Sequence, residues 1–114
     1  RIGYAIEEFT LRKGDFAIVL AATVVTLDEE GKVASARLTL GGVDGAPVVM
    51  DDVTEELIGK IPSREEITKA CQKIPELIDP EPDIHASSEY RKDLSVTLSR
   101  RVLERAVQKA DKAF

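Results

Sequence analysis

Few residues in this sequence are of a type that could perform chemistry unaided. The chain has one histidine, His85, and one cysteine, Cys71. His85 could act as a general base because its unperturbed pKa lies near neutrality, yet it lies between a proline-rich strap and a helix start, which favours a structural role. Cys71 falls on the apolar stripe of a predicted helix, where a buried thiol is unreactive. One thiol and one imidazole cannot complete a tetrahedral zinc site or hold an iron–sulfur cluster, so we predict no metal site and no catalytic residue.

Adjacent acidic residues recur along the chain, but none forms a convincing general acid/base pair. Neighbours in a strand point to opposite faces and neighbours in a helix diverge, so these side chains are expected to be solvated or to cap helices. The acidic pairs are Glu7/Glu8, Glu29/Glu30, Asp51/Asp52, Glu55/Glu56 and Glu65/Glu66.

The basic cluster Arg100, Arg101 and Arg105 surrounds Glu104 and is expected to form a salt-bridged surface.

Two glycine-containing segments are expected to form turns. Gly41-Gly42 is followed by no phosphate-binding motif, so a tight turn is expected there. Arg12-Lys13-Gly14-Asp15 places two cations and an acid on a turn in which Gly14 can adopt positive φ. Loops carry function more often than cores do, although a hairpin tip without function remains the default interpretation.

Length and charge limit the classes of function. The 114 residues suffice for one domain with a core, so residues 1–114 are taken as a single domain. The net charge of −5 disfavours nucleic acid as a partner, because phosphate binding needs a basic surface. No apolar run could span a bilayer and no leader is recognisable, so a cytoplasmic location is expected. Because the chain begins with Arg1, either a start was removed or the chain is part of a longer polypeptide.

The first part of the chain predicts strands. The second strand is almost wholly apolar and β-branched, so it is expected to be central and buried on much of both faces. The third strand alternates, with Val33, Ser35, Arg37 and Thr39 opposite a core face of Ala34, Ala36, Leu38 and Leu40. We predict strands over residues 3–11, 16–27 and 33–40, a hairpin turn over 28–32, and a short edge strand over 48–50.

The second part predicts helices. Asp52 with Glu55 resembles a capping box before a stop at Gly59, and Ser63 with Glu66 is a cleaner one. The helix after Ser63 has the apolar stripe Ile67, Ala70, Cys71 and Ile74. Residues 79–83 form an acidic, proline-rich strap. A long helix is expected from Ser87 or Ser88 to about Ala110, with a core face of Tyr90, Leu94, Leu98, Val102 and Ala106.

These elements predict an α+β fold. Consecutive strands joined by short turns favour an antiparallel sheet of three to four strands. The three helices that follow are expected to pack on one face of that sheet.

Four stretches occur in a fixed order along almost the whole chain. They are Phe9-x-x-Arg12-Lys13-Gly14-Asp15-Phe16-Ala17, Leu40-Gly41-Gly42-Val43 followed by Pro47, Ile78-Asp79-Pro80, and Asp83-Ile84-His85-Ala86-Ser87-Ser88-Glu89-Tyr90-Arg91. Together they closely resemble the C-terminal domain of the FAD-binding (medium) subunit of molybdenum hydroxylases, the carbon monoxide dehydrogenase and xanthine dehydrogenase family. The last stretch is the most specific of the four.

The resemblance implies a part in electron transfer. In that family, substrate is oxidised at a molybdenum cofactor on a large subunit, and electrons pass through iron–sulfur clusters on a small subunit to FAD on the medium subunit. FAD is bound mainly by two preceding domains, which this chain lacks. The chain is therefore expected to be the C-terminal fragment of an oxidoreductase subunit, not catalytic on its own, that packs beside the flavin and at subunit interfaces.

The resemblance also implies roles for single residues. Arg12, Lys13 and Asp15 match the segment that lies toward the flavin ring. The matching block His85, Ser87, Glu89, Tyr90 and Arg91 is expected to be structural or interfacial: Ser87 would cap the last helix, and Glu89 and Arg91 would anchor the strap or a neighbouring subunit. One departure is that Val48, Val49 and Met50 are apolar where family members often have a basic residue.

Two other functions stay open at this point. One is a stand-alone, non-catalytic interaction or dimerisation module, because related α+β folds serve that purpose. The other is a small enzyme that uses His85 and an acid, which would need a pocket.

Overall fold

The structure, a computed structural model, describes residues 1–10, 18–82 and 87–112. Along the chain it contains β1 (Ile2–Phe9), β2 (Val19–Leu27), β3 (Val33–Gly41), β4 (Val48–Val49), α1 (Asp51–Glu55), α2 (Arg64–Cys71), α3 (Ile74–Leu77) and α4 (Ser88–Lys112). The strands form one antiparallel sheet in the order β1-β2-β3-β4.

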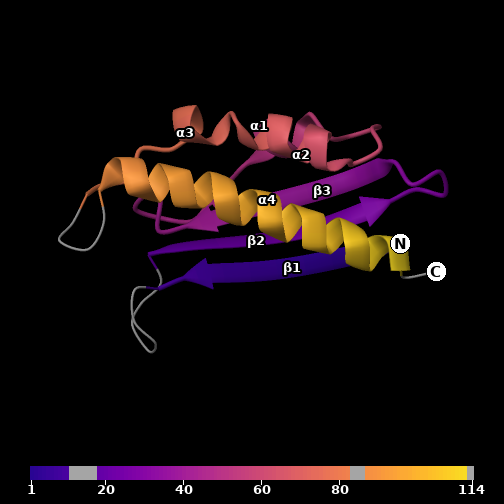
Figure 1. Ribbon diagram of the computed structural model, residues 1–114, viewed down its shortest axis with the longest axis horizontal. Coiled ribbons are helices and arrows are strands. Elements are labelled where there is room, and N and C mark those ends of the chain that lie inside the picture. Colours follow the sequence, from indigo (N-terminus) through magenta and orange to yellow (C-terminus); the bar gives the residue numbers. More distant parts are fainter. Residues whose placement is uncertain (11–17, 83–86, 113–114) are drawn as a thin grey trace.

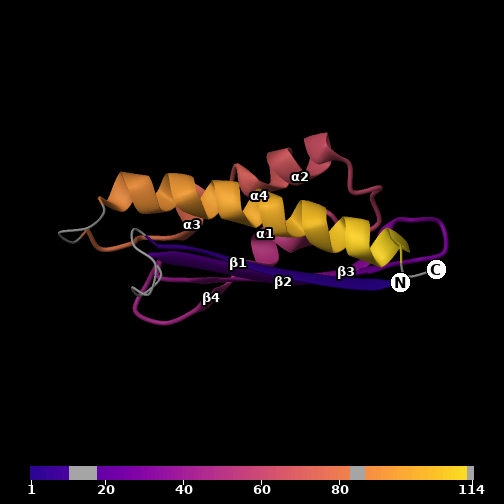
Figure 2. The ribbon, with the colours of Figure 1, turned by 60° about the horizontal axis from the view of Figure 1, so that its bottom comes forward.

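The helices lie on one side of the sheet, so the predicted α+β architecture is confirmed (Figures 1 and 2). The long helix α4 packs across β1 and β2, and α1 packs against β3. The four-residue turn α3 lies between the two longer helices and begins with Pro75 in its first turn, where proline is tolerated. None of the described helices is long and apolar enough to cross a membrane.

β2 is the central strand, as predicted, but it is buried on one face only. Its burial alternates: Val19, Ala21, Thr23, Val25 and Leu27 face the helices and are buried. On the other face Val24 is 48% exposed, because no described helix covers that side. The continuous apolar run therefore does not mark a strand enclosed on both faces, and the expectation of two-sided burial is wrong.

A β-bulge changes the predicted faces at the start of β3. Thr26 pairs with Ser35 but Leu27 pairs with Val33, so Ala34 is the extra residue. As a result Val33 is buried with Leu38 and Leu40, and Ala34 is exposed. The strict alternation expected from the sequence holds only beyond the bulge.

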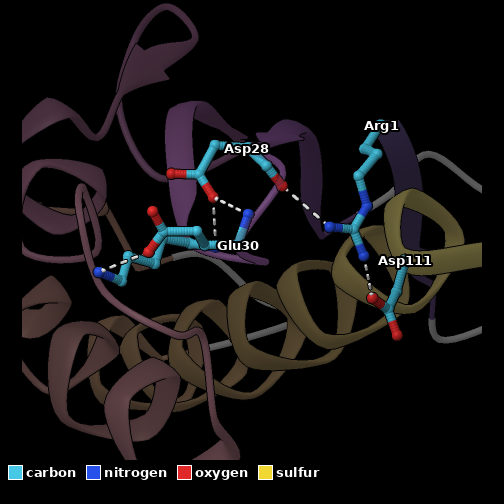
Figure 3. Close-up of polar contacts among 5 residues, drawn as sticks. Arg1, Asp28, Glu30 and Asp111 are labelled. Carbon is cyan, nitrogen blue, oxygen red and sulfur yellow. Dashed lines mark hydrogen bonds and ion pairs between the residues drawn. The ribbon is translucent and has the colours of Figure 1, made fainter.

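The predicted hairpin turn over residues 28–32 is present and is fixed by Asp28. Its carboxylate accepts hydrogen bonds of 2.9 Å from the backbone N–H groups of both Glu30 and Lys32. The Arg1 guanidinium donates to the Asp28 carbonyl at 2.9 Å and to the Asp111 carboxylate at 2.6 Å (Figure 3). One arginine thus joins the start of β1, the β2–β3 turn and the end of α4.

The two predicted capping boxes have different outcomes. Ser63 caps α2 as expected, with its hydroxyl accepting from the Glu66 N–H at 3.2 Å. The capping box at Asp52 is wrong, because α1 begins at Asp51 and its N-cap, Met50, makes no side-chain cap bond. The chain still turns at Gly59, whose φ is +80° and whose N–H donates to the Val33 carbonyl at 2.8 Å.

The buried face of α4 differs from the predicted one near the start of the helix. A residue turns about 100° around the axis, so a strict four-residue spacing drifts by about 40° per step. Over the four steps from Ala106 back to Tyr90 the drift is about 160°. Tyr90 is accordingly 40% exposed, whereas Arg91, Ser95 and Ser99 are buried together with Leu98, Val102, Leu103, Ala106 and Ala110.

Candidate functional site at the loop end of the sheet

Three segments distant in sequence meet at one end of the sheet, which we call the loop end. It is formed by Phe9 and Ile18, by Gly42, and by Tyr90 and Arg91 of α4. Phe9 and Ile18 lie on either side of residues 11–17, the segment that carries the motif Arg12-Lys13-Gly14-Asp15. The loop end therefore contains described residues from both sides of that motif.

Arg91 is the residue that joins the segments. Its guanidinium Nη1 donates to the Ile18 carbonyl at 2.7 Å and to the Gly42 carbonyl at 3.2 Å. The residue is only 8% exposed, so these charge-assisted bonds are shielded from water and strong. The Ser95 hydroxyl donates to the Arg91 carbonyl at 2.7 Å, one turn further along α4.

Gly42 is required by the close approach of the chain at Ile18. Its φ is +79°, a conformation that L-residues with a side chain rarely adopt. A Cβ at this position would lie 3.1 Å from the Ile18 carbonyl carbon and closer still to its oxygen. The predicted tight turn at Gly41-Gly42 is therefore present, and it presses the β3–β4 connection onto the start of β2.

An aromatic pair covers the same end. The rings of Phe9 and Tyr90 meet edge to face, with centroids 6.2 Å apart and planes at 77°. The Ile18 N–H donates to the Phe9 carbonyl at 2.8 Å, so the two ends of segment 11–17 are joined directly. Together these contacts hold Phe9 and Ile18 next to each other, and we call these two flanking residues the base of segment 11–17.

The residues predicted for the site fall into two groups. Arg12, Lys13, Asp15 and His85 lie outside the described residues, so the roles predicted for them stay predictions. The Ser87 hydroxyl accepts from the Tyr90 N–H at 3.1 Å, which is the helix cap that the sequence predicts. The Glu89 carboxylate is largely exposed and lies 3.9 Å from Lys92 on its own helix.

Sequence reasoning missed the contact between Arg91 and the sheet. The sequence does contain a pattern that indicates this contact. The buried face of α4 follows the helical period of 3.6 residues through Arg91, Ser95, Leu98, Val102 and Ala106. An arginine on such a stripe indicates buried carbonyl acceptors, since a buried cation needs partners.

The basic cluster on α4 is salt-bridged, as expected, but its main partner is Glu7. Arg101 and Arg105 contact the Glu7 carboxylate at 2.8 and 3.3 Å, and Arg100 contacts Glu104 at 3.7 Å. Glu7 points toward the helix layer and is not the solvated strand residue that its acidic neighbourhood suggests. These pairs link α4 to β1.

The described residues also form a shallow acidic depression between α1 and α3. It has a volume of about 350 Å³ and is lined by Asp52, Glu55, Glu56, Lys73, Glu76 and Leu77. Lys73 donates to Glu56 at 2.6 Å; this bond lowers the pKa of the Glu56 carboxyl and raises that of the Lys73 ammonium. Four carboxylates around one ammonium repel a pyrophosphate, so this depression does not suit a dinucleotide.

Cys71 is fully buried, as predicted. Desolvation raises the pKa of its thiol to about 12, so the reactive thiolate is essentially absent near neutral pH. Among the residues that the structure describes, no group of three or more His, Cys, Asp or Glu side chains could hold a metal ion.

Comparison with known proteins gives a consistent result. Residues 4–106 match the model of a family described as the CO dehydrogenase flavoprotein C-terminal domain. The chain is 36% identical over 108 residues to the 6-hydroxypseudooxynicotine dehydrogenase complex subunit alpha of Paenarthrobacter nicotinovorans, covering 95% of this chain and 36% of that protein. It is 30% identical over 108 residues to the carbon monoxide dehydrogenase medium chain of Afipia carboxidovorans, covering 95% and 37%.

Solved structures agree with the sequence relatives. The chain superposes on quinoline 2-oxidoreductase from Pseudomonas putida 86 with a TM-score of 0.89 and 29% identity, covering 96% of this chain and 38% of that one. The match with reconstituted CO dehydrogenase from Oligotropha carboxidovorans has a TM-score of 0.88 and 30% identity, covering 96% and 38%. The chain thus spans little more than a third of the length of the proteins it matches.

Proposed function

The chain belongs to the CO dehydrogenase flavoprotein C-terminal domain family, and on that premise we propose that it is the C-terminal domain of the FAD-binding subunit of a molybdenum hydroxylase-type oxidoreductase. Its partners in this proposal are the preceding FAD-binding domains, a large molybdenum-containing subunit and a small iron–sulfur subunit. The flavin, when bound, supplies the chemistry that receives electrons from the clusters and delivers them to an external acceptor.

The domain's own share in flavin binding is limited to one side of the ring. The acidic depression is unsuited to a pyrophosphate, and the sequence has no glycine-rich phosphate motif. The residues that suit the ring are Arg12, Lys13 and Asp15, which offer charge and hydrogen bonds without a phosphate cradle. We therefore assign the phosphates to the preceding domains and the ring edge to segment 11–17.

The observation that carries this assignment is the base of segment 11–17. Arg91 holds Ile18 against Gly42, and the Ile18 N–H is bonded to Phe9 on the other side of the segment. The residues that flank segment 11–17 therefore belong to a rigid part of the fold, and functional segments are often carried on such a scaffold. Glu89 and the exposed edge of Tyr90 lie beside this base and are available to a neighbouring subunit.

Arg12 and Asp15 should act on the flavin in opposite directions. A cation beside the ring stabilises the electron-rich reduced state, and a carboxylate destabilises it. In the intact, flavin-loaded subunit, Arg12→Ala is expected to lower the midpoint potential of the flavin. A change of about 10–30 mV corresponds to about 0.5–1.4 kcal/mol for a two-electron couple. Asp15→Asn is expected to raise the potential by a similar amount.

The matched control is Lys69→Ala, which removes an exposed cation from the last turn of α2, away from the loop end. Potentials are measured by spectroscopic redox titration, and the flavin content of each variant is measured from its absorbance. If Arg12→Ala and Asp15→Asn shift the potential no more than Lys69→Ala does, the assignment of segment 11–17 to the ring is wrong. A purified subunit that never contains FAD would contradict the proposed function as a whole.

A further inference from the structure

The side of the sheet opposite the helices carries an apolar surface, which we call the open face. Tyr4 lies opposite Val24, and Val24 lies opposite Arg37, so the register places these residues on the same side. Five large apolar side chains of this face are strongly exposed, from 43% for Val49 to 69% for Tyr4, and Leu20 is half-buried. The exposed apolar residues of the open face are Ile2, Tyr4, Ile6, Val24 and Val49.

The open face has few charges. Of the strand residues that point to this side, only Glu8 and Arg37 are charged, in a chain of which 32% is charged. The outer surface of the helices is different, because it carries ion pairs such as Arg64–Glu104 and Lys73–Glu56. A depletion of charge around exposed apolar side chains is typical of the centre of an interface.

The free edge of β1 is partly blocked, which favours docking on the face over docking at the edge. The Leu27 N–H donates to the Arg1 carbonyl, so odd-numbered residues of β1 direct their backbone groups at β2 and even-numbered ones point outward. The Lys109 ammonium of α4 donates to the outward carbonyl of Tyr4 at 3.1 Å and lies 5.4 Å from the centre of its ring. A lysine at this point hinders the addition of a further strand.

We propose that the open face is buried against the preceding part of the same polypeptide. This inference rests on the proposed function, because it requires the chain to be the C-terminal domain of a longer subunit. The relatives have nearly two-thirds of their length outside the matched region, and the family is described as a C-terminal domain. A covering partner of the required size is therefore present in the relatives themselves.

The place of β1 in the sheet suits this occupant. The side chain of Ile2, the first residue of β1, is part of the open face, so the preceding part of the polypeptide that we propose would join the domain at the border of that face. Covalent connection gives such a partner a high effective concentration, so even a modest apolar surface stays covered.

The test measures how accessible the open face is in the intact, flavin-loaded subunit. Ile6→Cys places a thiol on the open face at a residue that is 62% exposed in the domain. Ile61→Cys is the matched control, because Ile61 is 54% exposed and lies in the connection between α1 and α2. Cys71 is buried with a raised pKa and stays unlabelled while the domain is folded, so it reports on folding in the same experiment.

Both variants are treated with iodoacetamide, and the labelled peptides are quantified by mass spectrometry. We expect Ile6→Cys to react at least about tenfold more slowly than Ile61→Cys, with Cys71 unlabelled, because local opening must precede reaction at a covered site. The same protection is expected for Val24→Cys, near the centre of the face. Equal rates for the open-face and control thiols would overturn the inference.

Other occupants give different results, each of which overturns the proposal. Protection that disappears on dilution indicates a second copy of the subunit. Protection that appears only when the large or small subunit is added indicates that this subunit covers the face. A natural protein with an intact mass of only 12.5 kDa would leave no preceding segment to cover it. Failure of the inference alone is recognised by a subunit that retains FAD but whose open-face thiols are labelled as fast as the control, whereas a wild-type subunit that never contains FAD contradicts the proposed function.

Discussion

The contact between α4 and β1 at Gly3 gives a sharp prediction about stability. A Cβ on Gly3 would lie 2.6 Å from the Ala110 nitrogen and 3.0 Å from the Ala106 carbonyl carbon, and closer still to the Ala106 oxygen. These atoms belong to the helix backbone, so no side-chain rotation relieves the contact. Restoring normal separations requires α4 to move away from β1 by about 1 Å.

The expected cost of Gly3→Ala is at the upper end of the range for overpacking. Such changes typically cost about 1–3 kcal/mol, and the reduced entropy of the unfolded chain returns about 0.4–1 kcal/mol. We therefore expect a net loss of about 2 kcal/mol in the free energy of unfolding. For a domain of this size that corresponds to a fall of about 8 °C in Tm.

The assay is thermal and urea unfolding of the purified protein, followed by circular dichroism. Gly45→Ala is the control, because a Cβ at Gly45 meets no atom within 4 Å. Its effect is expected to stay within about 0.5 kcal/mol, as for most surface changes. If Gly3→Ala and Gly45→Ala have the same stability, α4 does not pack against β1 as closely as described.

Two further changes test the loop end and the acidic depression. Arg91→Met removes the donor to one buried and one partly buried carbonyl and should lower the free energy of unfolding by about 3 kcal/mol, measured by urea unfolding. Arg91→Lys should restore little of this stability. A loss below about 0.5 kcal/mol for Arg91→Met would show that these bonds do not stabilise the fold. Glu56→Gln tests the ion pair between Glu56 and Lys73, which lowers the pKa of the Glu56 carboxyl and raises the pKa of the Lys73 ammonium. The wild type should therefore have a higher free energy of unfolding than Glu56→Gln near neutral pH. This difference in stability should decrease below pH 4.5, as the carboxylate is protonated, and above pH 10.5, as the lysine loses its proton. An undiminished difference in the free energy of unfolding at about pH 3 would contradict the ion pair between Glu56 and Lys73.

The features predicted well from the sequence are those with a local cause. The Ser63 cap, the 28–32 turn and the buried positions Ile67, Ala70 and Cys71 depend on residues a few positions apart. The helix predicted there was too long, because α2 ends at Cys71 and the buried Ile74 begins α3. The antiparallel sheet with helices on one side follows from the order of these local patterns. The family was also recognisable from sequence, because four short motifs occur in a fixed order along the chain.

The features that sequence reasoning missed depend on tertiary contacts between elements. The bulge at Ala34 is visible only once the pairing of β2 and β3 is known. The one-sided burial of β2 depends on the absence of described helices from the other face, which an apolar run does not reveal. At the candidate site, the motif around Arg12 was identified from the resemblance, but its support by Arg91 and Gly42 comes from contacts across 73 and 49 positions of sequence.

The attachment of α4 at both of its ends has a mechanical consequence. Near its start Arg91 is bonded to the loop end, and near its end Ala106 and Ala110 lie against Gly3 while Asp111 holds Arg1. The 25 residues of α4 contain no proline or glycine and form a rod about 37 Å long, which resists bending. A displacement imposed at the loop end is therefore transmitted as a tilt to the corner where the chain starts. The helix thus acts as one stiff lever that couples the loop end to the corner formed by Arg1 and Asp111.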